Sequence, residues 1–558
     1  MVRATFSGFN TALSALQANQ KRLDITGQNL SNMNTAGYTR QQLEASSLNY
    51  TNPVSHYSNG NEIAVGFGVS MDRVSQIRDP YLDIQYRSQS ADCSYTNRLQ
   101  TALNSLSKVL DETTISGIRQ AFDDVQSTLT SMQDPAKVSD PIYESELRTK
   151  MQSVCNLFNQ ASRQITQAEQ NEFQRLTGEG SSEQGDVQKI NDILRQIGDL
   201  NVQIKRNQVA GHPSLELQDE RNLLLDELSG YIPIETRYYK DDAHSGNNAY
   251  DYDANGAVIG KKDWPDDLEV SMNYIDAQGK SQKLILVNGS DLGANGLTKN
   301  YGQLSVLKGD RQTAASVSDP ADISIKFEKA PSYKGNGQAA ADVYAELKGI
   351  RFEGGSLQAS LDMLQKTGTG NVIKGSTAVD DVRGYQYYSG KLDQLASTFA
   401  ESMNDINNNG KNPKDQNLLS NSTDDSTTGI TAGNIGISKG WTSGTVHIST
   451  NGTNRTDTIL DMIAAMKDTK KLNGKTFADY MNNLSTQLAS DSSSNQTALK
   501  TGTTVLNSIQ DSRDSLSGVS LDEEATNMMA YVSAYNAASR LMTALDEVLN
   551  TLISNTGA

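Results

Sequence analysis

The chain has 558 residues, of which 36% are hydrophobic and only 6% are aromatic, and its 49 lysines and arginines face 66 acidic residues, giving a net charge of −17. This excess of acid argues against a nucleic-acid binder, which needs a basic surface to neutralise phosphate, and against adhesion to an anionic membrane. The length predicts several domains, and the low apolar content is typical of long helices with narrow seams joined to small β-domains.

Two cysteines, Cys93 and Cys155, are too few for a disulfide framework or a thiolate metal site. Cys155 lies in a helical pattern and is predicted to be a buried small hydrophobe, while a bond between the two stays open. The N-terminus shows no apolar segment with a cleavage site, and no stretch approaches 18 continuous apolar residues. Neither an ordinary secretory signal nor a transmembrane helix is therefore predicted, and these features alone would place the chain in the cytosol.

The first element in chain order is a helix whose apolar residues recur in steps of three and four, as in a coiled-coil seam. Gln20 and Gly27 interrupt this seam, and an Asn-rich helix stop follows over residues 29–38. Asn and Gly tolerate positive φ, and Asn side chains bond nearby backbone groups, so an extended segment is predicted next. The large residues of this N-terminal seam, predicted to mediate assembly, are Phe6, Phe9, Leu13, Leu16, Leu23 and Leu30.

A tier of helices is predicted in the middle of the chain. Asp79-Pro80 and Asp140-Pro141 each combine an N-cap aspartate with a proline at the first helical position, so long helices should begin at both sites. The segment 231–353 is instead rich in Gly, Asp and Asn with short β-like runs, and it predicts an inserted β-rich domain. Further helical periodicity covers 190–204, 217–228, 382–406 and about 477–515.

The last element is a second heptad helix with a wider apolar face, because Val532, Leu541 and Val548 widen its main stripe. We predict that this helix can contact more than one neighbour. The residues of this C-terminal seam are Met528, Tyr531, Tyr535, Met542, Leu545, Leu549 and Leu552.

These patterns predict an α+β chain with long terminal helices, a helical-bundle core domain formed by N- and C-terminal segments, and an inserted β-rich outer domain. The predicted units are an N-terminal assembly helix with an extended segment (1–78), a helical core in three parts (79–230, 354–410 and 476–518), the β-rich outer domain (231–353), a variable linker with a small β-like segment (411–475) and a C-terminal assembly helix (519–558).

Three patterns could indicate chemistry, and each has a simpler interpretation. Asp251-Tyr252-Asp253-Ala254-Asn255-Gly256 fits the first half of an EF-hand loop, but Lys262 holds the twelfth position and Asn-Gly favours a hairpin turn, so weak calcium binding is left open. Gly66-Phe67-Gly68 has Met71 in place of a third glycine, which favours a strand over a nucleotide loop. No histidine has metal-ligand or triad spacing; the four are His56, His212, His244 and His447. The sequence predicts no catalytic residue, no cofactor and no metal site.

The string from Asn29 to Tyr38, NLSNMNTAGY, resembles the N-terminal signature of the rod, hook and hook-associated subunits of the bacterial flagellum. Its motif residues are Asn29, Asn32, Asn34, Thr35, Gly37 and Tyr38. Residues 65–82, 217–228, 354–357 and 519–552 resemble further segments of hook-associated subunits, whereas the inserted β-domain and 407–475 match poorly.

The resemblance implies a structural subunit, not an enzyme, that forms the junction between hook and filament. Such subunits leave the cell through the flagellar type III apparatus on an uncleaved signal, so the chain is expected outside the cell. The implied partners are the hook protein, a second junction protein leading to the flagellin filament, further copies of the chain in a ring, and a cytoplasmic export chaperone on the C-terminal seam; neither nucleic acid nor membrane insertion is expected. The alternatives are the hook protein itself, the second junction protein and a cytosolic coiled-coil scaffold.

Overall fold

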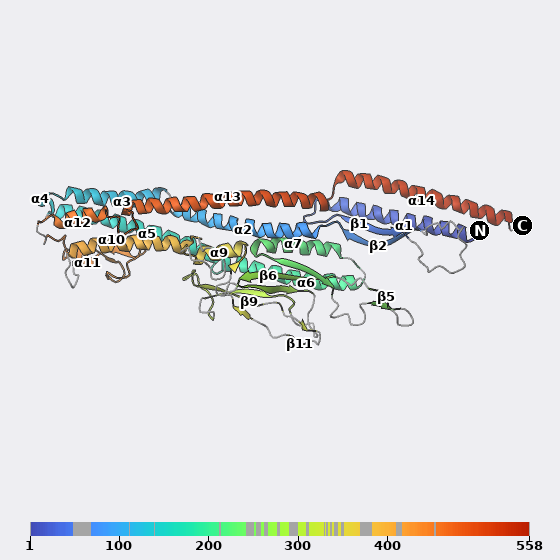
Figure 1. The fold of residues 1–558 in the computed structure, drawn as a ribbon, viewed down its shortest axis with the longest axis horizontal. Coiled ribbons are helices and arrows are strands. Elements are labelled where there is room, and N and C mark those ends of the chain that lie inside the picture. Colours follow the sequence, from blue (N-terminus) through green and yellow to red (C-terminus); the bar gives the residue numbers. More distant parts are fainter. Residues whose placement is uncertain are drawn as a thin grey trace.

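The computed structural model describes residues 2–47, 68–110, 112–138, 140–210, 212, 214–240, 250–252, 258–261, 266–275, 280–289, 299–308, 312–328, 330, 333–334, 338–339, 344–346, 351–368, 382–408, 416–450 and 454–556. The molecule is elongated, with the two terminal helices at one end, a helical core that runs to the other end, and small β-sheets against one flank (Figure 1). This arrangement confirms the predicted α+β class.

The terminal helices α1 (Val2–Asn32) and α14 (Leu521–Thr556) pack side by side, and both chain termini lie at the same end of the molecule (Figure 1). The predicted extended segment is the antiparallel hairpin of β1 (Gln41–Ser47) and β2 (Val69–Gln76), which packs on α1. Gly68, at φ +108°, lies just before β2, which contains Met71. Gly66 and Phe67 lie outside the described residues, so the strand interpretation of that segment stays a prediction.

The helical core begins as predicted at two Asp-Pro pairs. The carboxylates of Asp79 and Asp140 each accept a hydrogen bond of 2.9 Å from the backbone N–H two residues on, with proline at the first helical position. The helices of the core are α2 (Pro80–Val109), α3 (Glu112–Ser131), α4 (Pro135–Val138), α5 (Pro141–Thr177), α6 (Asp186–Val209), α7 (Leu215–Tyr231), α9 (Ser356–Gln365), α10 (Tyr385–Asn408), α12 (Asp457–Met466) and α13 (Phe477–Ser517).

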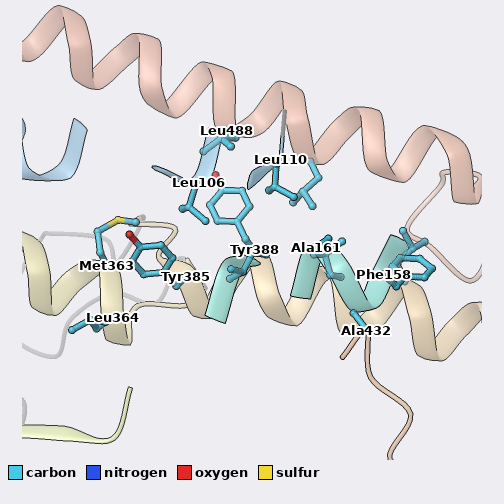
Figure 2. Close-up of a cluster of buried hydrophobic side chains, with 14 of the residues drawn as sticks. Leu106, Leu110, Phe158, Ala161, Met363, Leu364, Tyr385, Tyr388, Ala432 and Leu488 are labelled. Atoms are coloured by element: carbon cyan, nitrogen blue, oxygen red, sulfur yellow. The ribbon is translucent and has the colours of Figure 1, made fainter. Parts of the chain in front are cut away.

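Aromatic rings from distant parts of the chain close this core. Phe122 of α3 lies 5.9 Å from Phe158, 5.2 Å from Phe399 and 5.6 Å from Phe477, measured between ring centroids. Farther along, Tyr388 points toward α13, beside Leu106 (Figure 2). Each of the three phenylalanine pairs around Phe122 adds about 0.5–1.5 kcal/mol of stability beyond the contribution of the area that it buries. The core is therefore built jointly from segments before and after the β-rich insertion.

The insertion consists of antiparallel strands, and α6 covers its main sheets. Asn201 of α6 donates from Nδ2 to the carbonyls of Leu268 and Gly289, which fixes the helix to the sheet. One sheet has the order β13-β6-β3 with β7 also on β6, a second has the order β12-β9-β8, and two pairs, β4-β5 and β10-β11, stand apart. The strands are β3 (Glu235–Lys240), β4 (Tyr250–Tyr252), β5 (Val258–Lys261), β6 (Asp266–Ile275), β7 (Ser281–Asn288), β8 (Gln303–Lys308), β9 (Ile323–Glu328), β10 (Tyr333–Lys334), β11 (Gln338–Ala339), β12 (Tyr344–Glu346) and β13 (Arg351–Phe352).

The antiparallel pairing of β4 and β5 agrees with the hairpin interpretation of the Asp251–Gly256 segment. Residues 253–257, which include Asp253, Asn255 and Gly256, lie outside the described residues, as does the twelfth position, Lys262. Weak calcium binding there stays untested.

Residues 411–475 carry more structure than the predicted linker with a small β-like segment. The described part contains β14 (Leu419–Asn421), β15 (Ile435–Ile437), α11 (Lys439–Ser443) and α12. Trp441 of α11 is fully buried, and its Nε1 donates to Glu144 over 2.8 Å. The β-like stretch was predicted over 434–450, but β15 covers only three of these residues, because Ser438 caps a helix at the next position by accepting from the Trp441 N–H. The boundaries of the predicted domains stay predictions.

Cys93 and Cys155 are both free and buried, so they do not pair. Burial raises the pKa of the Cys155 thiol to about 12, as expected for the inert small hydrophobe that was predicted. Within the part of the chain that the structure describes, no helix is long and apolar enough to cross a bilayer.

Candidate functional site

The flagellar motif residues lie where the end of α1, the start of β1, helix α7 and the α13–α14 connection meet. A cavity of about 800 Å³ lies at this meeting point, and Gly37, Thr39, Asp219 and Arg513 are among its lining residues. Because these segments are far apart in sequence, the site joins the terminal helices to the helical core.

Asn29 forms the centre of the helix stop. Asn29 is 1% exposed. Its side chain forms two hydrogen bonds of 3.0 Å with the backbone of Gln41: Nδ2 donates to the Gln41 carbonyl, and Oδ1 accepts from the Gln41 N–H. The Tyr38 hydroxyl donates to the same Asn29 Oδ1 over 2.9 Å. A primary amide suits this position because it carries its donor and its acceptor on separate atoms, so it can bond the N–H and the carbonyl of one residue together.

The other motif residues shape the turn between Asn29 and Gln41. Thr35 donates from its hydroxyl to Asn32 Oδ1 and from its N–H to the Asn32 carbonyl. Gly37 adopts φ +76°, and a Cβ there would lie 2.4 Å from Cγ of Leu223 on α7. Both the backbone conformation and the close packing therefore demand glycine. Asn34 is exposed, and the structure assigns it no role in the turn.

Asp219 of α7 holds the residue that follows Tyr38. One carboxylate oxygen accepts from the Thr39 hydroxyl over 2.7 Å, the other accepts from the Thr39 N–H over 3.1 Å, and Arg78 lies 3.9 Å away. Burial raises the pKa of Asp219, while the bonds from Thr39 and the charge of Arg78 oppose this shift. Burial, with the charge of Asp219, also raises the pKa of Tyr38 to about 12, so Tyr38 stays a neutral donor.

Arg40 ties the base of α14 to β1. Its guanidinium pairs with Glu524 over 2.9 Å and with Glu523 over 2.6 Å, and its backbone N–H donates to the Ser517 carbonyl. Glu523 and Glu524 lie in the first turn of α14, where negative charge is also favoured by the helix dipole. The direction in which α14 leaves the core is thus set by contacts with the N-terminal motif.

A chain of ion pairs continues from the motif into the core. Arg513 of α13 pairs with Asp83 over 3.1 Å and with Asp226 over 2.7 Å, and it stacks over the Tyr86 ring at 4.2 Å. Asp226 also accepts from Arg87, and Asp83 from Arg78. Breaking one partner out of such a buried network typically costs about 3–5 kcal/mol, so the network holds α2, α7 and α13 in one arrangement.

The ion-pair network was not predicted from the sequence. The available signal was the 217–228 segment, whose resemblance to hook-associated subunits includes Asp219 and Asp226. A pattern of apolar periodicity cannot show which charged residues of separate helices will face one another.

The N-terminal seam is only partly covered in the single chain. Leu13 is 46% exposed, and Phe9, Leu16, Leu23 and Leu30 are half-buried. The side chain of Phe6 lies outside the described residues. Among the α1 residues whose burial is described, the most buried apolar ones are Ala12, Ala18 and Ile25. The small side chains of the two alanines allow the backbone to approach its neighbours closely. The predicted seam thus flanks the contact face of α1 and stays a proposal for assembly.

The C-terminal seam lies largely against α1. A Cβ added at Gly8 would lie 3.4 Å from the Leu545 side chain, and the Arg22 guanidinium lies 5.6 Å from the centre of the Tyr531 ring. Met528, Met542 and Leu549 are half-buried along the same face, whereas Tyr535 and Leu552 are exposed. The seam residues keep their assembly role as a proposal.

A second stripe on α14 faces outward. Val532, Leu541 and Val548, the residues predicted to widen this face, are 43%, 49% and 54% exposed. Leu541, Val548 and the exposed Leu552 follow a spacing of seven and four residues. This spacing places the three side chains on one face of the helix, beside the face that contacts α1. The site is therefore suited to holding helices together and to presenting apolar surface. Among the described residues, no group of three or more His, Cys, Asp or Glu is placed to bind a metal ion.

Three models of flagellar protein families match separate parts of the chain. Residues 103–418 match the model of the flagellar hook-associated protein FlgK helical domain, residues 9–39 match that of the flagella basal body rod protein, and residues 512–555 match that of the flagellar basal body rod FlgEFG protein C-terminal region.

Flagellar hook-associated protein 1 of Bacillus subtilis is 28% identical over 99% of both chains. The protein of the same description from Salmonella typhimurium is 28% identical over 40% of this chain and 38% of its own length. A solved structure titled the flagellar hook junction protein FlgK, from Burkholderia pseudomallei, has a TM-score of 0.36 and 17% identity over 61% of this chain and 44% of that chain. Because one family model covers more than half of the sequence, the resemblance to hook-associated subunits is confirmed, and the chain belongs to the flagellar hook-associated protein FlgK family.

Proposed function

We propose that the chain is a structural subunit of the junction between hook and filament, and that it assembles through α1 and α14 after export. A structural role in the bacterial flagellum follows from its family. The observation that carries the finer proposal is the pairing of α1 with α14 at one end of the molecule, with apolar side chains left on the outer faces of both helices.

Each partner of the proposal is supported by a different feature. The partly exposed seam of α1 and the outward stripe of α14 are suited to contacts with neighbouring copies in a ring. They are also suited to contacts with the hook protein on one side of the ring and with a second junction protein on the other. The outward stripe also suits an export chaperone, because an amphipathic helix is recognised through apolar residues at this spacing. Export by the type III route to the outside of the cell is proposed because the family is flagellar.

A deletion strain tests the proposal. We expect intact hooks and unpolymerised flagellin in the medium, with motility restored by the full chain. Complementation by a variant with Leu541, Val548 and Leu552 changed to serine should fail, whereas Ile142→Ser, an exposed apolar residue at the start of α5, should restore motility.

The same experiment separates the alternatives. Loss of the hooks themselves would favour the hook protein, and accumulation in the cytoplasm with none in sheared flagella would favour a cytosolic scaffold. Normal filaments in the deletion strain would refute the junction role altogether.

A further inference from the structure

The paired-helix end of the molecule, called the end module from here on, consists of α1, β1, β2 and α14 and is packed separately from the core. The large cluster of buried apolar side chains in the core and the insertion begins at Ala102 and ends at Leu488 in chain order, and among the described residues it takes no member from the end module. The end module is held together instead by the pairing of α1 with α14 and by the hairpin on α1. The two bodies therefore meet at a joint without a shared apolar core, where α13 ends and α14 begins (Figure 1).

Hydrogen bonds to the start of α7 link the end module to the core. The carboxylate of Asp219 accepts two hydrogen bonds from Thr39, over 2.7 and 3.1 Å. Gln76 Nε2 donates to the carbonyl of Leu215 over 2.9 Å. The apolar Leu223, on the same helix, is 43% exposed. The link to α7 thus depends mainly on polar groups, whose hydrogen bonds water can replace.

Two cavities flank the joint. One is the cavity of about 800 Å³ at the flagellar motif. The other, of about 660 Å³, lies between β2, the start of α2, α7 and β3. Arg78 and Asp83, which form an ion pair, are among the lining residues of both cavities. Protein interiors are normally close-packed, so these spaces leave the elements at the joint room to change their relative angle.

The structure on either side of the joint is firmly bonded. In the end module, the hydrogen bonds of Asn29 join α1 to the start of β1, and the ion pairs of Arg40 join that strand to α14. In the core, the ion pairs of Arg513 join α13 to α2 and α7. The chain passes between the two bodies at residues 77–79 and 518–520, and neither segment belongs to a helix or a strand. Any bending between the bodies is therefore expected at these two segments.

We propose that the joint is a hinge: the end module turns as a rigid body against the core about residues 77–79 and 518–520, and the bonds between Asp219 and Thr39 latch it in the orientation described. Hinges are typically a few residues at the ends of elements, where the change in backbone angles is taken up. Hydrogen bonds to a carboxylate are stronger than neutral ones, so the latch favours one orientation, and it can open because water replaces both donors. Such a hinge operates in the single chain, so it does not depend on the proposed junction role.

Distances between spin labels on the purified full-length chain test the hinge. A pair of labels at positions 508 of α13 and 536 of α14 spans the joint, while the pairs 17–536 and 101–508 lie within the end module and within the core; all four positions are exposed. Labels carried by non-natural residues leave the native cysteines in place. We expect Asp219→Ala to widen the distance distribution of the spanning pair at least twofold and to leave both internal pairs unchanged. Thr39→Val, which removes one of the two donors, should widen the spanning distribution less.

Asp192→Ala is the matched control, because it removes a carboxylate of α6 whose side chain is 41% exposed, and it should leave all three distributions as in the wild type. An unchanged spanning pair in Asp219→Ala, with both internal pairs intact, would refute the latch. If Asp219→Ala combined with Gln76→Ala also left the spanning pair unchanged, the hinge itself would be refuted. Widening of the pair 17–536 would show that the end module is not a rigid body, which likewise overturns the proposal. Neither hook nor filament enters these measurements, so the deletion strain judges the junction role separately.

Discussion

Replacement of Asn29 by alanine offers the most direct test of how the motif works. Asn29→Ala leaves the N–H and the carbonyl of Gln41 without their partner in a buried place, and it removes the acceptor of the Tyr38 hydroxyl. Each unsatisfied buried group costs about 1–3 kcal/mol, so the two backbone groups together predict a loss of about 2–6 kcal/mol. The loss should be local, because the contacts of the core are untouched.

Hydrogen exchange is the suitable assay, since a chain of this size need not unfold in one step. The amide of Gln41 should exchange at least tenfold faster in Asn29→Ala, with peptides of α5 unchanged. Asn32→Ala is the matched control, because Asn32 is only partly buried and its side-chain hydrogen bonds are exposed and local, to Gln28 and Thr35. Exchange at Gln41 equal to that of the wild type in Asn29→Ala would refute the role given to this side chain.

Three further predictions concern stability. Gly37→Ala should destabilise the motif by about 1–3 kcal/mol, because φ is positive at this residue and the new Cβ meets Leu223. Adding Leu223→Ala should relieve the clash but not the backbone strain. Hydrogen exchange over residues 35–41 measures both effects. Glu172→Ala should lower the free energy of unfolding by about 3–5 kcal/mol, because it leaves Arg98 buried and unpaired. The double variant Arg98→Met, Glu172→Leu should recover most of this free energy in urea denaturation. A double variant as unstable as Glu172→Ala would contradict this reasoning. Burial raises the pKa of Glu169 from 4.5 to about 6. Its contribution to stability is therefore complete below pH 4.5, and about 2 kcal/mol is lost as the pH rises through 6. Glu169→Gln should flatten this part of the stability–pH curve, and an unchanged curve would contradict the assignment.

Much of the helical architecture could be predicted, because its signals are local. Asp79-Pro80 and Asp140-Pro141 are complete start signals, and the periodicity of 477–515 reappears as α13. The short helices α11 and α12 were missed because tertiary contacts stabilise them: the buried Trp441 anchors α11, while α12 packs on α3 and α10.

The candidate site could be predicted only in part. The helix stop at Asn29 and Gly37 was visible because Asn and Gly have distinctive backbone preferences. The roles of Arg40, Asp219 and Arg513 depend on partners that are hundreds of residues away in sequence, and no local pattern encodes such pairings. Likewise, the leucine spacing of α1 located an apolar stripe, but the closest packing falls on neighbouring alanines, where small size decides the approach.

The pairing of α1 with α14 also affects the order of events during folding. These two helices are separated by nearly the whole chain, and closing so long a loop carries an entropic cost that local helices do not bear. Long-range contacts of this kind are expected to form late, after the more local contacts of the core. A chain that stops before α14 therefore leaves α1 without its partner, and Arg40 without Glu523 and Glu524. A product shortened by an error in synthesis therefore differs in structure from the finished molecule, because only a chain translated through its last helix can display the paired helices.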